Sequence, residues 1–275
     1  MPKYLLIGCF LWLTIPVFAQ TQTNEATAAL YNAGVAAYKA HDFKTALLKF
    51  GKALQAQPNY WEAYFNRAQI YVLENKIPQA IADLEAAAKY NPKDATIPYN
   101  TGVLYAKNKN WTAAIPAFSA AIRLDATYAA AYSNRAESYR IGKQYAEALA
   151  DIDTAFAIGK PLPQAYHTRA MILVAQGKTK EAIKQLDIVC NAKSPKMQPY
   201  MERGSLLLEV GRFKDAAVDF SKVIFLVPDF SAAYIARGKA KYGAGNAEGA
   251  CADWTRAAEL NDPEAEILLR ESCSD

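Results

Sequence analysis

The sequence is poor in the residues from which active sites and metal centres are usually built. Its 275 residues include two histidines and four cysteines. His41 and His167 have no cysteine, serine or carboxylate constellation around them. No glycine-rich phosphate loop, zinc-ligand spacing or calcium-binding loop occurs in the sequence. These absences argue against an enzyme and predict that the protein holds no cofactor and no metal ion.

The sequence also lacks strand signals and a large charge imbalance. Its 31 lysines and arginines stand against 27 aspartates and glutamates, which gives a net charge of +4. Such a small excess does not form the basic surface that nucleic-acid binding requires. We therefore expect an all-α protein whose partners do not include nucleic acid.

The first twenty residues differ from everything that follows. Lys3 supplies positive charge, residues 4–18 form a nearly unbroken apolar run, and Val17 and Ala19 are the small residues of a cleavage site. The apolar run is short for a stable membrane span. This pattern predicts a signal peptide over residues 1–19, and hence a periplasmic or secreted protein without a membrane span after cleavage. The alternative is a lipid anchor at Cys9, because residues 6–9 resemble the box before the lipidated cysteine of bacterial lipoproteins.

A pattern of constant period fills the rest of the chain. Alanine recurs in one register at Ala46, Ala80, Ala114, Ala148, Ala182, Ala216 and Ala250. Four residues after each alanine stands a bulky apolar residue: Phe50, Leu84, Phe118, Ile152, Leu186, Phe220 and Trp254. A spacing of four residues is one helical turn, and a small residue beside a large one lets two helices approach closely. The chain is therefore an array of internal helical repeats.

At these residues the chain resembles the tetratricopeptide repeat family, whose unit is a helix-turn-helix with the same period. The resemblance implies a right-handed α-solenoid of seven repeats, preceded by a flexible segment over residues 20–26 and followed by a capping helix over residues 265–275. The seven repeats are residues 27–60, 61–94, 95–128, 129–162, 163–196, 197–230 and 231–264. Pro116 interrupts the second helix of the third repeat, which we expect to be bent or shortened.

Arginine stands in one register of five repeats, and aspartate follows four of these arginines by sixteen residues. The pairs are Arg67 with Asp83, Arg135 with Asp151, Arg203 with Asp219, and Arg237 with Asp253. Arg169 faces the neutral Gln185 instead. A series of cations can also form an anion-binding surface. The shared presence and absence of the two residues favours ion pairs between the two helices of a repeat, which fix helix orientation.

Asparagine occupies a second register in the first four repeats, at Asn32, Asn66, Asn100 and Asn134. Aromatic residues precede three of these asparagines, namely Tyr31, Phe65 and Tyr99. In tetratricopeptide superhelices the first helices line the concave face, where asparagine can hydrogen-bond both polar groups of an extended peptide backbone. The resemblance thus implies a peptide-binding groove at these residues. Two alternatives stay open: the asparagines are a common family feature without a ligand, and the rings pack between adjacent first helices.

Export makes the cysteines informative, because disulfides form in oxidising compartments. Cys251 lies on the second helix of the last repeat, and Cys273 lies on the predicted capping helix. Antiparallel packing of these helices predicts a disulfide between the two cysteines. Cys190 replaces an aliphatic residue, so we expect a buried and inert thiol.

Taken together, the sequence predicts a non-catalytic protein–protein interaction scaffold of the periplasm or cell envelope. Its partner would be an extended protein segment held in the concave groove. One alternative is a structural or assembly subunit of an envelope complex that uses its convex face or its ends. Another is an accessory subunit of an exported enzyme.

Overall fold

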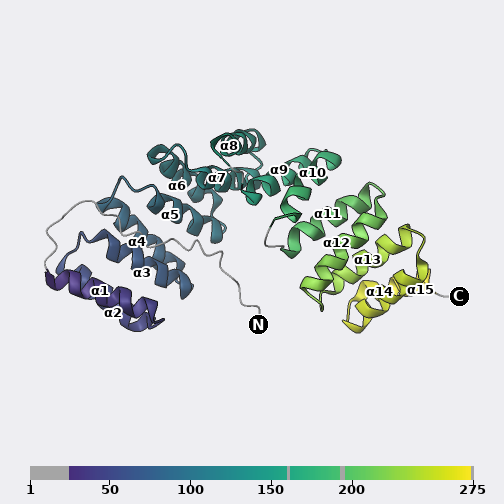
Figure 1. Ribbon diagram of the computed structural model, residues 1–275, viewed down its shortest axis with the longest axis horizontal. Helices are drawn as coiled ribbons and strands as arrows, with labels where there is room; N and C mark the ends of the chain where they lie inside the picture. Colours follow the sequence, from purple (N-terminus) through teal and green to yellow (C-terminus); the bar gives the residue numbers. More distant parts are fainter. Residues whose placement is uncertain (1–24, 160–161, 193–195, 274–275) are drawn as a thin grey trace. The chain divides into compact units, whose positions relative to one another are not determined.

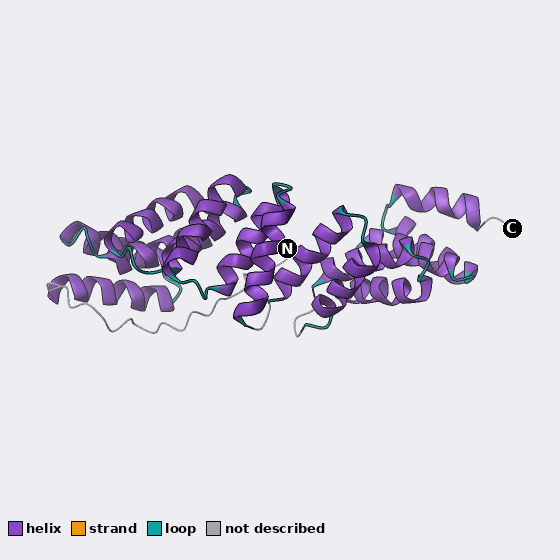
Figure 2. Cartoon of the chain, turned by 90° about the horizontal axis from the view of Figure 1, so that it is seen from above, coloured by secondary structure: helices purple, strands orange, loops and turns teal. Residues whose placement is uncertain are grey.

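The computed structural model describes residues 25–159, 162–192 and 196–273, and these residues form fifteen α-helices joined by short loops (Figure 1). No strand occurs in these three ranges (Figure 2). The helices are α1 Glu25–Lys39, α2 Phe43–Ala56, α3 Trp61–Leu73, α4 Ile77–Tyr90, α5 Thr96–Lys107, α6 Trp111–Leu124, α7 Ala129–Ile141, α8 Tyr145–Ile158, α9 Pro163–Ala175, α10 Thr179–Cys190, α11 Met197–Glu209, α12 Phe213–Leu226, α13 Ser231–Gly243, α14 Ala247–Glu259 and α15 Pro263–Ser272. The all-α repeat fold predicted from the sequence is confirmed.

The second helices begin one repeat period apart, and each follows a tight turn of one design. One residue in each turn has positive φ: His41, Asn75, Lys109, Lys143, Gly177, Gly211 and Gly245. In the first turn, the backbone N–H of His41 donates to the carbonyl of Tyr38, and the N–H of Asp42 donates to that of Ala37. These bonds satisfy the last carbonyls of a helix that ends in a left-handed residue. The turn therefore reverses the chain at the same place in every repeat.

The repeated alanines and their bulky partners form the core between paired helices. All seven alanines have no exposed surface, and their seven partners are at most 3% exposed. Glycine on the facing first helix makes room for the largest partners: a Cβ added at Gly34 would lie 2.7 Å from the ring of Phe50. Close packing of this kind between the two helices of a repeat contributes to stability. Each repeat also buries apolar surface on its neighbours.

The chain divides into two compact units, residues 1–92 and 93–275. The described part of the first unit contains α1 to α4, and the second unit contains α5 to α15. Within the second unit, α15 packs on α14 through Leu268, Leu269 and Cys273, which contact the buried cluster around Trp254. Helix α15 thus stands where the capping helix was predicted, but it spans Pro263–Ser272 and not residues 265–275. No helix within residues 25–159, 162–192 and 196–273 is long and apolar enough to cross a membrane.

Two helix ends differ from what the sequence predicted. Helix α6 is not shortened by Pro116: it spans 14 residues, as α4 and α8 do. Asn110 caps it by accepting a hydrogen bond from the N–H of Ala113, and the loss of one backbone donor at proline does not end the helix. Helix α1 starts at Glu25, so the predicted flexible segment 20–26 loses its last two residues to a helix whose first turn favours an acidic side chain.

Candidate functional site

Arginine and aspartate meet across the two helices of a repeat in all four predicted pairs. Arg67 donates from Nε and from a terminal nitrogen to the two carboxylate oxygens of Asp83, each at 2.7 Å. Arg135 with Asp151, Arg203 with Asp219, and Arg237 with Asp253 repeat this bidentate geometry, with distances of 2.6–2.9 Å. The aspartate side chains are at most 8% exposed. Buried carboxylates of this kind need their cations, because an unpaired buried charge is costly.

Three of these arginines also reach back to the preceding repeat. A terminal nitrogen of Arg203 donates to Asp187 at 2.8 Å, and Arg135 and Arg237 donate in the same way to Ser119 and Ser221. Each of these acceptors precedes its arginine by sixteen residues. The arginines thus connect consecutive repeats as well as the helices of one repeat, a contact that the sequence pattern did not predict.

Arg169, which the sequence placed opposite Gln185, also contacts the preceding repeat. Arg169 donates to Asp153 on α8 at 2.8 Å. Asp153 also precedes its arginine by sixteen residues, so a search in both directions along the chain would have found it. Arg67 is held in the same way within its own repeat: its hydrogen bond to Asp83 is the main cause that raises its pKa. The arginine register is committed to contacts inside the fold.

The four predicted asparagines lie on first helices, two in each unit. The Asn66 amide donates to the Tyr31 hydroxyl at 2.8 Å, and the Asn134 amide donates to that of Tyr99 at 3.0 Å. Asn100 donates to the Thr96 carbonyl of its own helix, and Asn32 is exposed. In the described ranges, none of these four side-chain carbonyl oxygens accepts a hydrogen bond from the protein. Each asparagine therefore keeps an acceptor for another molecule.

The aromatic residues in front of the asparagines pack against their own repeats. Tyr31 lies 4.9 Å from Tyr60 and 5.8 Å from Phe50, measured between ring centroids. Tyr99 has the same surroundings, with Tyr128 at 4.7 Å and Phe118 at 6.0 Å. Phe65 instead meets the edge of Trp61 at 6.5 Å. The two tyrosines join adjacent first helices through their hydroxyls, so packing between first helices is one of their roles.

The asparagine series is followed by charged side chains in the second unit. His167 Nε2 lies 2.7 Å from a carboxylate oxygen of Glu202, with the same 35-residue separation as Tyr31 and Asn66. Thr168 donates to Glu137, which also pairs with Arg140 at 2.7 Å. Side chains therefore join consecutive first helices here as well, but the contact now involves a carboxylate in place of the neutral amide of asparagine. The sequence showed no carboxylate around His167, so this partner was missed.

A shallow pocket of about 290 Å³ lies between α9 and α11 in this charged region. Its lining comprises Met171, Val174, Met201, Glu202, Ser205 and Leu206. The lining is apolar apart from Glu202 and Ser205, and the flexible methionines adapt readily to different shapes.

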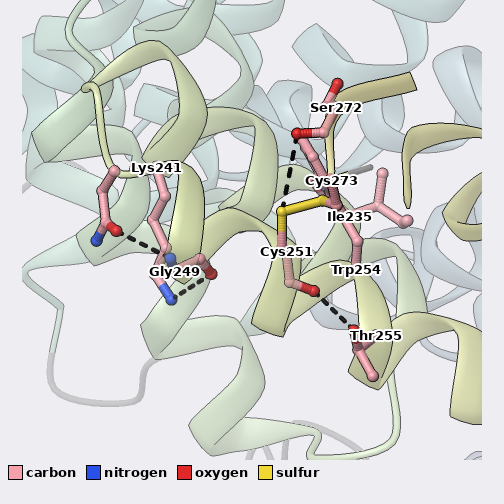
Figure 3. The surroundings of a disulfide bond; sticks show 9 residues. Ile235, Lys241, Gly249, Cys251, Trp254, Thr255, Ser272 and Cys273 are labelled. Atoms are coloured by element: carbon pink, nitrogen blue, oxygen red, sulfur yellow. Dashed lines mark hydrogen bonds between the residues drawn. A yellow bond between two sulfur atoms is a disulfide. The ribbon is translucent and has the colours of Figure 1, made fainter. Parts of the chain in front are cut away.

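The predicted disulfide joins Cys251 on α14 to Cys273 at the end of α15, with a Cα–Cα distance of 5.8 Å (Figure 3). It fixes the capping helix beside Trp254 and Ile235, which belong to the same buried cluster. Cys190 is free and buried, and burial is the main cause that raises the pKa of its thiol to about 12. The thiolate is the reactive form of cysteine, so Cys190 is protected from oxidation and alkylation.

The predicted signal peptide and the candidate lipid anchor Cys9 lie outside the described residues. Within residues 25–159, 162–192 and 196–273, no group of three or more histidine, cysteine, aspartate or glutamate side chains could hold a metal ion.

Comparison with known sequences points to one family. Two profiles, both described as tetratricopeptide repeat, match residues 71–129 and 201–266 in one case and 37–98 in the other. Tetratricopeptide repeat protein 36 of Mus musculus is 45% identical over 71 residues, which are 26% of this chain and 38% of that protein. Its Homo sapiens counterpart is 42% identical over 73 residues, with the same coverage. The match therefore spans well under half of the relatives' length.

Solved structures have the same fold. A tetratricopeptide repeat protein from Parabacteroides merdae superposes with a TM-score of 0.67 at 18% identity, covering 91% of this chain and 100% of that one. YrrB, described as a TPR protein with an unusual peptide-binding site, superposes with a TM-score of 0.57 at 20% identity over 68% of this chain and 97% of its own. The repeat register, the paired helices and these matches agree: the chain belongs to the tetratricopeptide repeat family.

Proposed function

We propose that this protein is a non-catalytic protein–protein interaction scaffold of the periplasm or cell envelope, which binds an extended partner segment on its first helices. The observation that carries the proposal is the asparagine series with its uncommitted side-chain oxygens. Each oxygen can accept a hydrogen bond from a backbone N–H, and Asn66 and Asn134 are positioned by bonds to Tyr31 and Tyr99. YrrB supports the proposal as a fold neighbour with a peptide-binding site.

Export to the envelope rests on residues 1–19, whose charged start, apolar run and small residues fit a cleaved signal peptide. The disulfide between Cys251 and Cys273 supports it further, because such bonds persist in oxidising compartments. Mass spectrometry of the mature protein tests this part. A chain that begins at Gln20 agrees with the proposal, and an intact Met1 in the purified envelope protein contradicts it.

The binding role is tested by crosslinking in the native cell, followed by partner identification. The Asn66→Ala/Asn100→Ala variant should recover the partner poorly, since two backbone contacts are lost. A matched variant, Asn59→Ala/Asn108→Ala, removes two exposed asparagines from loops and should recover the partner as the unaltered protein does. Equal recovery by both folded variants would contradict binding on the first helices.

A second candidate is an assembly subunit that uses its second helices. Val218 and Phe225 are 68% and 76% exposed, and their spacing of seven residues places them on one face of α12. Exposed apolar groups of this size on one helix face suit a protein contact. Under this alternative, Val218→Ser/Phe225→Ser abolishes partner recovery while Asn66→Ala/Asn100→Ala does not.

A further inference from the structure

We propose that Tyr31, Tyr60 and Glu62, with Asn66 beside them, form a site for a cationic side chain, lysine or arginine, of the bound protein segment. The inference rests on the proposed function, in which the first helices bind a partner segment. It adds the chemistry that the partner must bring to the first unit.

The four residues come together from three places in the first unit. Tyr31 lies on α1, and Tyr60 directly precedes α3 with its ring 4.9 Å from that of Tyr31. Glu62 stands in the first turn of α3, and Asn66 follows it by one helical turn. Asn66 donates to the Tyr31 hydroxyl at 2.8 Å, which holds the amide beside the tyrosine pair. Glu62 and Asn66 thus lie on one face of α3, and Asn66 joins that face to the tyrosine pair.

Glu62 is a partly buried carboxylate without a cation. In the described part of the chain, no lysine or arginine forms an ion pair with it. Burial raises its pKa, which means that the carboxylate is poorly solvated where it stands. Burial and then the charge of Glu62 raise the pKa of Tyr31, and the same causes raise that of Tyr60 to about 12. A backbone hydrogen bond at Glu62 opposes the shift of its own pKa, and no cationic side chain in the described residues contributes to that shift.

The second unit contains the same tyrosine arrangement with alanine at the place of Glu62. Tyr99 lies 4.7 Å from Tyr128, and Asn134 donates to the Tyr99 hydroxyl at 3.0 Å. Ala130 occupies the place, two repeats further along the chain, that Glu62 has in the first unit. The tyrosine pair and the asparagine are therefore found with either glutamate or alanine at this place. Glu62 is an addition to this arrangement, and its carboxylate is the group that a cationic side chain of the partner would pair with.

Ammonium and guanidinium groups suit this site on two grounds. They pair with a carboxylate, and they are attracted to the faces of aromatic rings. A neutral side chain of equal length would gain only the apolar contact. We therefore expect this partly desolvated site to bind a cationic side chain about tenfold more tightly than a neutral one of equal length.

The experiment is an NMR titration of the full chain with two pentapeptides, acetylated and amidated, which carry either lysine or norleucine between alanines. The lysine peptide should bind about tenfold more tightly and shift the signals of Tyr60, Glu62 and Asn66. Glu62→Gln should remove the preference. The matched variant Glu25→Gln, an exposed glutamate of α1, should keep it. Thermal unfolding of both variants shows that loss of preference is not loss of the fold.

The Ala130→Glu variant provides a test that does not depend on removing a partly buried group. It completes the arrangement at Tyr99 and Tyr128, so the lysine peptide should shift signals there as well. Equal binding of both peptides to the unaltered protein, or an unchanged preference in folded Glu62→Gln, would overturn the proposal. If the Asn66→Ala/Asn100→Ala variant still loses its cellular partner in that case, the proposed function stands and only the cation site fails.

Discussion

In the first four repeats an asparagine stands on each first helix, whereas the last three carry Thr168, Glu202 and Ala236 at that place. The tight turns differ between the same groups. The left-handed residue is His41, Asn75, Lys109 or Lys143 in the first four repeats and glycine in the last three. Since left-handed geometry strains residues that carry a side chain, the early turns are the costlier ones.

Contacts that join repeats differ as well. Arg203 in the sixth repeat bonds to aspartates of two repeats, while Arg67 in the second has Asp83 alone. The disulfide also lies in the last repeat and its capping helix. The comparison shows that one scaffold of alanines and bulky partners carries a series of asparagines in its early repeats and a second aspartate contact and a disulfide in its late repeats. Substitutions in matched positions can test this difference.

The largest expected effect comes from the ion pairs. Asp83→Ala removes the one acidic partner that Arg67 has in the described residues and should lower the free energy of unfolding by about 4 kcal/mol. Asp219→Ala should cost less, because Arg203 keeps Asp187. Chemical denaturation monitored by circular dichroism measures both. Equal losses would show that the contact between repeats adds nothing in the late repeats.

The disulfide should have the next largest effect. Replacing Cys251 and Cys273 together by serine should cost about 3 kcal/mol of local stability in the chain-entropy model. The loss should be confined to α14 and α15, since each repeat contacts only its neighbours. Hydrogen exchange locates the effect. Faster exchange in α1 to α4 of the variant would contradict this independence of the early repeats.

The helix interface should respond alike in both groups of repeats. A Cβ at Gly102 would lie 2.7 Å from the Phe118 ring, and one at Gly204 would lie 2.8 Å from that of Phe220. Gly102→Ala and Gly204→Ala should therefore each cost about 2 kcal/mol through overpacking, despite the higher helix propensity of alanine. Phe118→Ile should restore the first variant, because Ala136 and Ile152 combine the same two residue types in the fourth repeat. Unequal losses of stability in Gly102→Ala and Gly204→Ala would contradict a helix interface that is the same in early and late repeats.

The turns should give the smallest effect. Lys143→Gly should raise stability by about 1 kcal/mol, since glycine adopts positive φ without strain. Gly211→Ala should lower it by a similar amount. Thermal unfolding of the two single variants measures both changes in stability. A loss of stability in Lys143→Gly would mean that the lysine side chain stabilises its turn.

Much of the fold follows from the sequence because one constant repeat period fixes both the helices and their shared core. Alanine four residues before a bulky residue appears in every repeat and is buried in every repeat. The arginine–aspartate pairs could be found because presence and absence covary within the chain. Partners such as Ser119 and Asp153 lie in the preceding repeat, so finding them requires a search across repeats as well as within one.

The bonds from asparagine to tyrosine were missed for the same reason. Asn66 and Tyr31 are 35 residues apart, so their contact reflects the offset between neighbouring first helices and not the repeat period. Glu62 carried no signal at all in the sequence, because one acidic residue in the first turn of a helix is common. Its meaning appears only beside Tyr31 and Tyr60, and in contrast with Ala130.

The most direct test of this division of roles is the dissociation constant of the partner identified by crosslinking, measured with two folded variants. Asn66→Ala/Asn100→Ala should raise the constant about tenfold through the loss of two hydrogen bonds. Arg135→Ala should lower the melting temperature and leave the constant unchanged, because Arg135 is bound to Asp151 and Ser119. A large loss of affinity in folded Arg135→Ala, with unchanged binding by the asparagine variant, would contradict the account.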